Sequence, residues 1–233
     1  MQLKLTLWRR ALVAAGLVAI LLSGNTAPAR AGSTNHPVLP PGASPYGSTY
    51  AEWSARWWQW ALAIPAASNP LNDGSDCLHG AEGQSGSVWF LGGAIDVSTN
   101  AERNCSVPVG KALFFPVINV ECSTVEAPPF YGADADALRT CADGFAFAGV
   151  YAEIDGIAVR NVERYLVQSP VFDFTLPQNN VLGLAAGTGS SVSNGIYLLL
   201  PPLSAGEHVI RFGGTYPDFD FSIAITYHLS VGK

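Results

Sequence analysis

Residues 221–231 read FSIAITYHLSV. Apolar side chains occupy every odd-numbered position of this stretch, and small or polar side chains occupy every even-numbered one. Successive side chains of a strand point to opposite faces, so this alternation predicts a half-buried antiparallel strand with its odd-numbered residues toward a core. A helix would instead bury every third or fourth residue. The end of the chain is therefore assigned to the β class.

Further strands and turns fit the region upstream of this stretch. Asp155-Gly156 lies between the strand-like segments Ala152-Glu153-Ile154 and Ile157-Ala158-Val159, and both turn residues tolerate positive φ, so a two-residue hairpin is predicted. Strands are also expected at residues 88–91, 112–120, 171–176, 196–200 and 207–212, with Pro116 marking an edge or a bulge. Together they predict a mainly β fold: a single antiparallel β-sandwich or jelly-roll-like domain.

One N-terminal helix is predicted over residues 49–64. Thr49 and Glu52 have the spacing of a capping box, and Pro65 ends the run. The stripe expected to face the core consists of Trp53, Trp57, Trp60 and Ile64, with Trp58 and Leu62 on its flank.

Residues 1–31 are predicted to be a cleavable signal peptide. Lys4, Arg9 and Arg10 precede an apolar stretch at 11–22, and Ala29-Arg30-Ala31 is a small-x-small cleavage pattern. The apolar stretch is shorter than the about 20 residues that span a bilayer, although an uncleaved anchor stays an alternative. Arg9-Arg10 also leaves the twin-arginine route open beside general export. Cleavage near Ala31 implies a periplasmic or extracellular protein.

The mature chain is expected to have a Pro- and Gly-rich lead-in and one domain. Residues 32–47 are interpreted as an extended, mobile lead-in, followed by the domain at 48–233. Removing the first 31 residues leaves eight basic against 18 acidic residues, a net charge of −10. Nucleic acid and anionic lipid are poor partners for such a chain. No second long apolar segment follows, so no membrane span is expected in the mature chain.

The four cysteines all lie in the mature part of the chain. An even number in an oxidising compartment favours two disulfides. Three pairings are possible, and sequential pairs are preferred because they close loops of modest length, each worth about 2–4 kcal/mol. The preferred pairs are Cys77 with Cys105 and Cys122 with Cys141.

Four segments together resemble a family of uncharacterised exported bacterial proteins. They are AEWSARWWQW at 51–60, GQSGSVWFL at 83–91, VPVGKALFFP at 107–116 and PLSAGEH at 202–208. The resemblance implies an N-terminal Trp-rich helix and a C-terminal β-sandwich region, and it brings no activity with it. The last segment also resembles turns of Ig-like bacterial sandwiches, which concerns the fold alone.

Catalytic and metal motifs are weak in this sequence. No nucleophile elbow, phosphate loop, EF-hand or HExxH pattern is present, and no cofactor is implied. Asp73, Asp76 and His79 lie within seven residues, beside Cys77, and are the candidate catalytic group. Two acidic pairs could supply calcium or acid/base chemistry, with solvated turns as the alternative: Asp218 with Asp220, and Asp134 with Asp136. His228 is expected at the surface, on the polar face of its strand.

A ligand-binding face is expected on the helix. An aromatic face beside polar groups suits a sugar ring, and the candidate residues are Glu52, Arg56, Trp58 and Gln59. The leading hypothesis is a non-catalytic exported β-sandwich protein that binds a carbohydrate, an envelope polymer or a protein partner. One alternative is a secreted hydrolase with carboxylate acid/base residues. Another is a structural protein that self-associates. Ligand, substrate and oligomeric state stay open.

Overall fold

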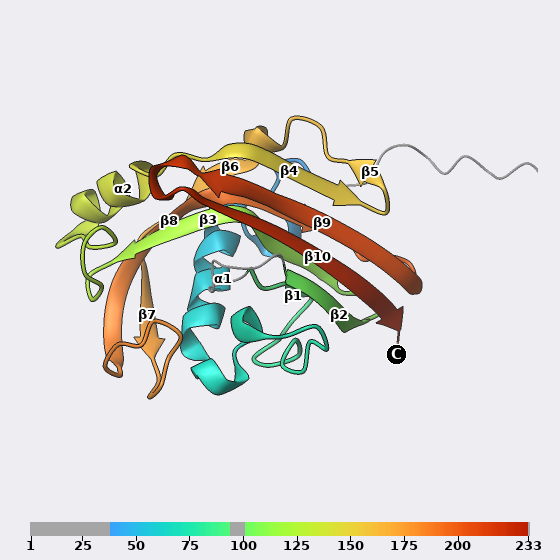
Figure 1. The fold of residues 1–233 in the computed structure, drawn as a ribbon, viewed down its shortest axis with the longest axis horizontal. Coiled ribbons are helices and arrows are strands. Elements are labelled where there is room, and N and C mark those ends of the chain that lie inside the picture. Colours follow the sequence, from blue (N-terminus) through green and yellow to red (C-terminus); the bar gives the residue numbers. More distant parts are fainter. Residues whose placement is uncertain (1–37, 94–100, 233) are drawn as a thin grey trace, which may run out of the picture. The chain divides into compact units, whose positions relative to one another are not determined.

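Two sheets face each other in the computed structural model, which describes residues 38–93 and 101–232 (Figure 1). The first sheet has the order β1-β3-β8-β6, with β7 also paired to β8: β1 Val88–Phe90, β3 Ala112–Ser123, β8 Gly187–Leu200, β6 Leu166–Gln168 and β7 Phe172–Leu176. The second has the order β2-β10-β9-β4-β5: β2 Ala101–Pro108, β10 Phe221–Gly232, β9 Gly206–Tyr216, β4 Ala148–Ile154 and β5 Ile157–Ala158. The predicted mainly β, two-sheet fold is confirmed.

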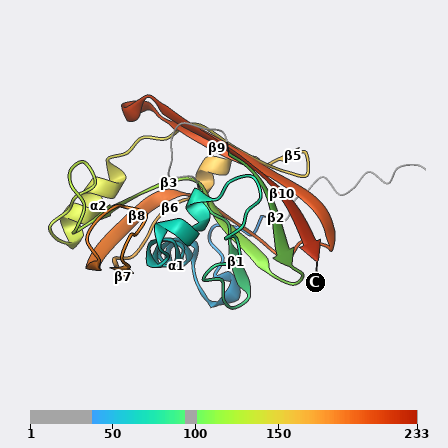
Figure 2. The same ribbon diagram turned by 60° about the horizontal axis from the view of Figure 1, so that its bottom comes forward.

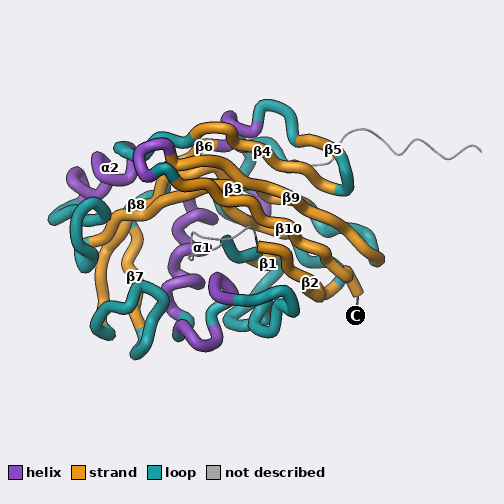
Figure 3. The backbone as a smooth tube through the Cα atoms, in the orientation of Figure 1, coloured by secondary structure: helices purple, strands orange, loops and turns teal. Residues whose placement is uncertain are grey.

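The described helices lie apart from each other along the chain and in space (Figure 3). They are α1 at Tyr50–Ala63 and α2 at Ala135–Asp143, with short 3₁₀ turns at Pro45–Gly47, Ala66–Ser68, Pro70–Asn72, Val162–Tyr165 and Pro217–Phe219. The capping box of Thr49 and Glu52 is formed at the start of α1. The predicted helix at 49–64 is thus confirmed, whereas α2 is not predicted from the sequence.

Strand β10 has the predicted side-chain alternation. It pairs antiparallel with β9 on one side and parallel with β2 on the other, so it is an interior strand. Ile225, Tyr227 and Leu229 are buried, while Ser222 and Ser230 are exposed. Parallel pairing also occurs between β1 and β3. Most strand pairs of the predicted sandwich are antiparallel, and the pairs β1–β3 and β2–β10 make the sheets mixed.

Strand β3 is buried on both faces. The second sheet covers one face, as the contact of Phe115 with Phe212 shows, and α1 packs on the other side of the first sheet (Figure 2). This double coverage explains why the strand is a continuous apolar run. The register shifts between Pro116 and Ile118, so Pro116 marks a bulge in an interior strand rather than an edge.

Strand β8 is longer than the sequence predicts. Residues 187–195 read GTGSSVSNG; the sequence predicts a flexible loop at 187–190 and a strand only at 196–200. In the structure they pair with β7 and β3. A Cβ on Gly195 would lie 2.5 Å from Cβ of Asn119, and one on Gly189 would lie 2.8 Å from the ring of Phe174. Small residues are needed here because neighbouring side chains approach closely. The segment therefore lacks the alternation of apolar and polar residues by which a strand is recognised in a sequence.

The turn at Asp155-Gly156 is a confirmed hairpin between β4 and β5. Both residues have positive φ, 50° and 80°.

The lead-in at 32–47 differs from the prediction that it is mobile. The signal peptide, its cleavage site and residues 32–37 lie outside the described residues, but Val38 and Leu39 pack against the core, and Leu39 N–H donates to the carbonyl of Leu199 at 2.9 Å. The described part of the lead-in is therefore fixed to the domain rather than mobile.

The preferred disulfides, Cys77–Cys105 and Cys122–Cys141, are both formed. They tie the loop before β1 to β2, and the end of β3 to α2. Neither α1 nor α2 has the length and apolar content of a membrane span, within the part of the chain that the structure describes. Disulfides of this kind are consistent with export to an oxidising compartment.

Candidate functional site

Helix α1 joins four separate parts of the chain through its indole N–H groups. Trp53 donates to the carbonyl of Pro45, Trp57 to Leu91, Trp60 to Glu82, and Trp58 to the hydroxyl of Tyr197, at 2.9 to 3.1 Å. A buried indole N–H needs such a partner. The predicted core stripe of Trp53, Trp57, Trp60 and Ile64 is confirmed as buried.

Trp58 does not lie on the expected binding face. Its indole donates to the hydroxyl of Tyr197 on the face of the first sheet that α1 covers, and Trp58 lines a small hollow with Asn119 and Tyr216. Position 58 is about 200° around the helix from position 56, so the two side chains leave α1 on opposite sides. The predicted group of Glu52, Arg56, Trp58 and Gln59 is thus corrected: Trp58 belongs to the packing of α1 against β8.

Glu52 and Arg56 are both exposed on the outer face of α1 but have different partners. The Glu52 carboxylate accepts from Thr49 N–H at 2.7 Å and from the Thr49 hydroxyl at 3.1 Å. These hydrogen bonds hold the pKa of Glu52 below its ordinary value. The Arg56 guanidinium lies 4.8 Å from the ring centroid of Trp53, in a cation–π contact.

An aromatic hollow of about 740 Å³ lies beside Arg56 and Gln59. Trp53, Trp60 and Phe90 line it, and the Phe90 ring contacts those of Trp53 and Trp60 with centroids 6.1 and 5.4 Å apart. The exposed ring of Tyr46, three apolar residues and several polar or small ones complete the lining: Ile64, Pro65, Val88, Glu82, Gly83, Ser85, Gly86 and Ser87 among them. Aromatic rings with a polar rim are typical of ligand sites.

A second hollow, of about 720 Å³, adjoins the first at Gln59 and Ala63, which line both. Gln59 donates to the carbonyl of Asp173 at 2.9 Å and so ties α1 to β7. The second hollow is lined mainly by hydroxyl and carboxylate side chains: Thr124, Asp173, Thr175, Thr188 and Ser190. We call these two adjacent hollows the α1 trough. One end is aromatic, the other is polar, and Gln59 lies between.

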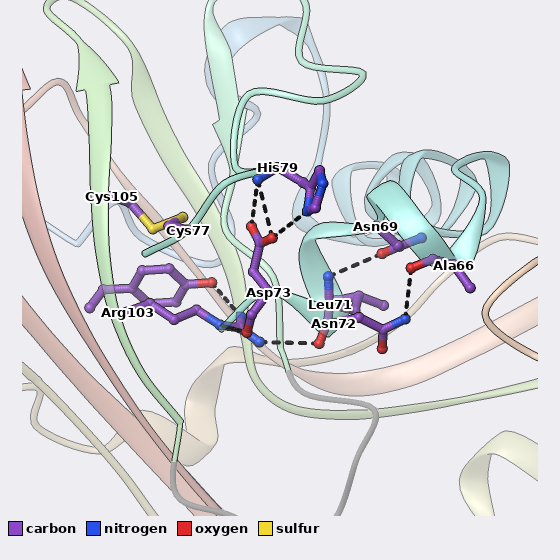
Figure 4. Close-up of polar contacts among 10 residues, drawn as sticks. Ala66, Asn69, Leu71, Asn72, Asp73, Cys77, His79, Arg103 and Cys105 are labelled. Carbon is purple, nitrogen blue, oxygen red and sulfur yellow. Dashed lines mark hydrogen bonds and ion pairs between the residues drawn. A yellow bond between two sulfur atoms is a disulfide. The ribbon is translucent and has the colours of Figure 1, made fainter. Parts of the chain in front are cut away.

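The candidate catalytic residues Asp73 and His79 do meet (Figure 4). The Asp73 carboxylate is almost fully buried and accepts from His79 N–H at 3.0 and 3.1 Å, and it lies 2.7 Å from His79 Nδ1. Asp73 and Asp76 also line a hollow of about 190 Å³ walled by the Cys77–Cys105 disulfide. Among the described residues, the hydrogen bonds of the Asp73 carboxylate all go to His79, an arrangement that closes the 73–79 loop.

Arg103 is a residue that sequence reasoning missed. Its side chain is 2% exposed and donates to the carbonyls of Leu71, Asp73 and Gly93 and to the hydroxyl of Tyr227, at 2.8 to 3.2 Å (Figure 4). It therefore holds the loop that carries Asp73 against β2 and β10. A clue was available, because Arg103 stands at an inward position of the alternating strand β2, where an apolar residue is usual.

The acidic pairs considered for metal binding have structural partners. Asp134 caps α2 by accepting from Ala137 N–H at 2.9 Å, with Asp136 in the first turn. Asp218 accepts from Ala146 N–H at 3.4 Å, and Asp220 ends the 3₁₀ turn with a positive φ. Within residues 38–93 and 101–232, no three His, Cys, Asp or Glu side chains are grouped as metal ligands. His228 is at the surface and pairs with Glu102 at 2.8 Å.

A third histidine connects the β4–β5 hairpin to β9. His208 Nδ1 lies 2.7 Å from a carboxylate oxygen of Asp155, and His208 Nε2 lies 2.9 Å from the carbonyl oxygen of Ser204. Two oxygen acceptors suit the imidazolium form, in which both nitrogens donate. Burial lowers the pKa of His208, but the hydrogen bonds to Asp155 and Ser204 raise it by more, so the pKa lies above its ordinary value.

This raised pKa predicts a pH dependence of stability. In the unfolded chain His208 titrates near its ordinary pKa of about 6.5. Its contribution to the free energy of unfolding should be fully present below that pH and should be lost as pH rises through the higher folded-state pKa. In urea denaturation between pH 5 and 9, His208→Gln should abolish this pH-dependent contribution to the free energy of unfolding, and His228→Gln should retain it. Parallel curves for wild type and His208→Gln would contradict the assignment.

The chain has few matches among known proteins. No family model and no curated protein matches it. One similar solved structure is that of PbICP-C in complex with falcipain-2; the matching chain is 13% identical, the match covers 63% of this chain and 99% of that one, and the TM-score is 0.24. A likeness at that TM-score carries no argument about function. The function therefore has to be argued from the site itself.

Proposed function

We propose that this protein is an exported, non-catalytic binding protein whose α1 trough holds a carbohydrate or another hydroxyl-rich envelope polymer. The observation that carries the proposal is the adjacency of the two hollows: Gln59 and Ala63 line both of them on the exposed side of α1. Two adjacent hollows of about 720 and 740 Å³ suit several linked units rather than one small molecule. Export is supported by the two disulfides.

The chemistry of the lining supports a sugar polymer. At the aromatic end, Tyr46 is 41% exposed and lines the hollow with Trp53 and Trp60, so apolar ring surface is offered beside polar groups. At the other end, the hydroxyls of Thr175 and Thr188 line the wall and can donate and accept. Alternating apolar and hydrogen-bonding surface matches the faces and edges of pyranose rings.

The Asp73 region supports this proposal less well than it supports a structural role. Its carboxylate is buried and bound to the main chain and ring of His79. A hydrolytic acid/base pair needs carboxylates that reach a substrate bond. We therefore assign the Asp73–His79 pair to loop closure and place ligand binding at the trough.

Binding should depend on the trough residues and on ligand length. In calorimetric titration of the mature protein with β-1,4-linked glucose and N-acetylglucosamine oligomers, we expect affinity to rise from dimer to hexamer. Tyr46→Ala and Gln59→Ala should each weaken hexamer binding about tenfold, because aromatic contact and hydrogen bonding are each worth about 1 kcal/mol or more.

A matched variant outside the trough controls for general effects on the surface. Tyr151 on β4 is 45% exposed, so Tyr151→Ala removes a similar ring elsewhere and should leave affinity within twofold. The proposal fails if no oligomer binds at millimolar concentration, or if Tyr46→Ala and Tyr151→Ala behave alike.

A further inference from the structure

Three phenylalanine rings meet between the flanks of α2 and the β9–β10 connection. Phe130 precedes α2, Phe145 follows it, and Phe219 lies in the 3₁₀ turn between β9 and β10. The ring centroids are 5.3, 5.5 and 6.2 Å apart, and the ring planes differ by 4° to 19°. We call these three residues the Phe cluster. Phe130 and Phe145 flank the same helix, whereas Phe219 comes from a distant part of the sequence, so the fold itself brings it to them.

The Phe cluster is partly open to solvent. Phe219 is 46% exposed, and Phe130 and Phe145 are half-buried. Tyr131, next to Phe130, is exposed as well. Several large aromatic side chains gathered at one exposed place are typical of an interaction surface, whereas single exposed apolar residues are common.

The segments that carry the Phe cluster are strongly acidic. Residues 123–147 and 216–221 contain six acidic residues and one basic residue: Glu126, Asp134, Asp136, Asp143, Asp218 and Asp220, against Arg139. Arg139 donates to Gln168 and to the carbonyl of Ser169, so its charge is directed toward β6. Asp218 accepts from Ala146 N–H, which places one carboxylate beside the residue that follows Phe145.

We propose that the Phe cluster and its carboxylates bind an arginine-bearing segment of a partner protein. A guanidinium is planar, so it stacks on aromatic rings, and its fork of N–H donors pairs with a carboxylate through two hydrogen bonds. Asp218 and Asp220 flank Phe219 in sequence and supply that carboxylate. A lysine ammonium shares the charge but not the planar shape, so the surface should prefer arginine. The Phe cluster shares no residue with the α1 trough, so this inference stands or fails separately from the proposed function.

Two peptides of equal length and charge test the inference. One carries four arginines spaced by glycine and serine, and the other carries four lysines at the same positions. In calorimetric titration of the mature protein at physiological salt, we expect the arginine peptide to bind at least about fivefold more tightly. Phe219→Ala should weaken its binding about tenfold and remove the preference over lysine. Phe219→Leu, which keeps apolar bulk without a ring, should behave like Phe219→Ala.

Two variants that each remove one charge distinguish binding at this surface from attraction by the overall negative charge of the protein. Asp220→Asn retains a residue that tolerates the positive φ at this position and should weaken binding. Glu163→Gln removes the same charge from an exposed position on the turn before β6 and should have less than a twofold effect. Circular dichroism and melting curves confirm that each variant is folded, and Tyr151→Ala controls for loss of an exposed ring.

Three results would overturn the inference. The first is equal affinity for both peptides with equal effects of Asp220→Asn and Glu163→Gln, which would show long-range attraction alone. The second is self-association of the wild type, measured by sedimentation without peptide and abolished by Phe219→Ala, which would identify a second copy as the occupant. The third is the absence of peptide binding at millimolar concentration.

Discussion

Ile225→Asp should prevent folding, whereas Thr226→Asp should leave the protein folded with a loss of no more than about 1 kcal/mol. Ile225 is fully buried and pairs with Phe212 of β9 and Ala101 of β2, so an aspartate there places an unpaired charge among apolar side chains. Thr226 is only half-buried and lies between Arg211 and Glu102 on the other face of β10. Soluble yield, circular dichroism and urea denaturation measure the contrast.

The contrast tests the sandwich on which both binding surfaces depend. Adjacent positions are changed in the same chemical way, so only the direction of the side chain differs. Equal soluble yield and matching spectra for both variants would contradict the assignment of β10 as an interior strand.

Arg103→Met should lower the free energy of unfolding by about 3 kcal/mol or more. The guanidinium supplies donors to the buried carbonyls of Leu71, Asp73 and Gly93, and each acceptor left without a donor costs about 1–3 kcal/mol. Methionine fills part of the space but donates no hydrogen bond. The midpoint of chemical denaturation, measured on the oxidised protein, gives the loss.

Arg211→Met is the matched control for this variant. Arg211 is exposed and pairs with Glu153 at 2.8 Å between β9 and β4, and a surface ion pair of this kind is worth about 0–1 kcal/mol. We expect a small shift for Arg211→Met and a large one for Arg103→Met. Similar midpoints would mean that the loops around Asp73 keep their conformation without the buried guanidinium.

The sequence predicts well those elements whose packing follows local periodicity. Three features are each specified by a few neighbouring residues, and all three are present: the alternation in 221–231, the hairpin at Asp155-Gly156 and the capping box of Thr49 and Glu52. The pairing of cysteines also followed from short spacings. In each case the interaction involves residues close together in the chain, so their order alone contains the information.

The sequence did not predict the elements whose residue types are explained only by their neighbours in the fold. Strand β8 begins with glycines and serines because β3, β7 and α1 approach it closely, and β2 places Arg103 where an apolar residue is usual. Both patterns look irregular until the neighbouring strand or loop is known. Pro116 signalled a bulge, but whether its strand was at an edge depended on β1 and β8.

For the two binding surfaces, too, the sequence determined some features and only the tertiary structure decided the others. By itself the sequence determined that a Trp-rich helix carries Arg56 and Gln59 on one face and Trp53, Trp57 and Trp60 on another, since 3.6 residues per turn fix those directions. Only the tertiary structure decided that Trp58 turns inward to Tyr197, that Gln59 lines two adjacent hollows beside β7, and that Phe130, Phe145 and Phe219 meet. These contacts join residues tens of positions apart, and their geometry arises from sheet pairing and core packing, which no local pattern specifies.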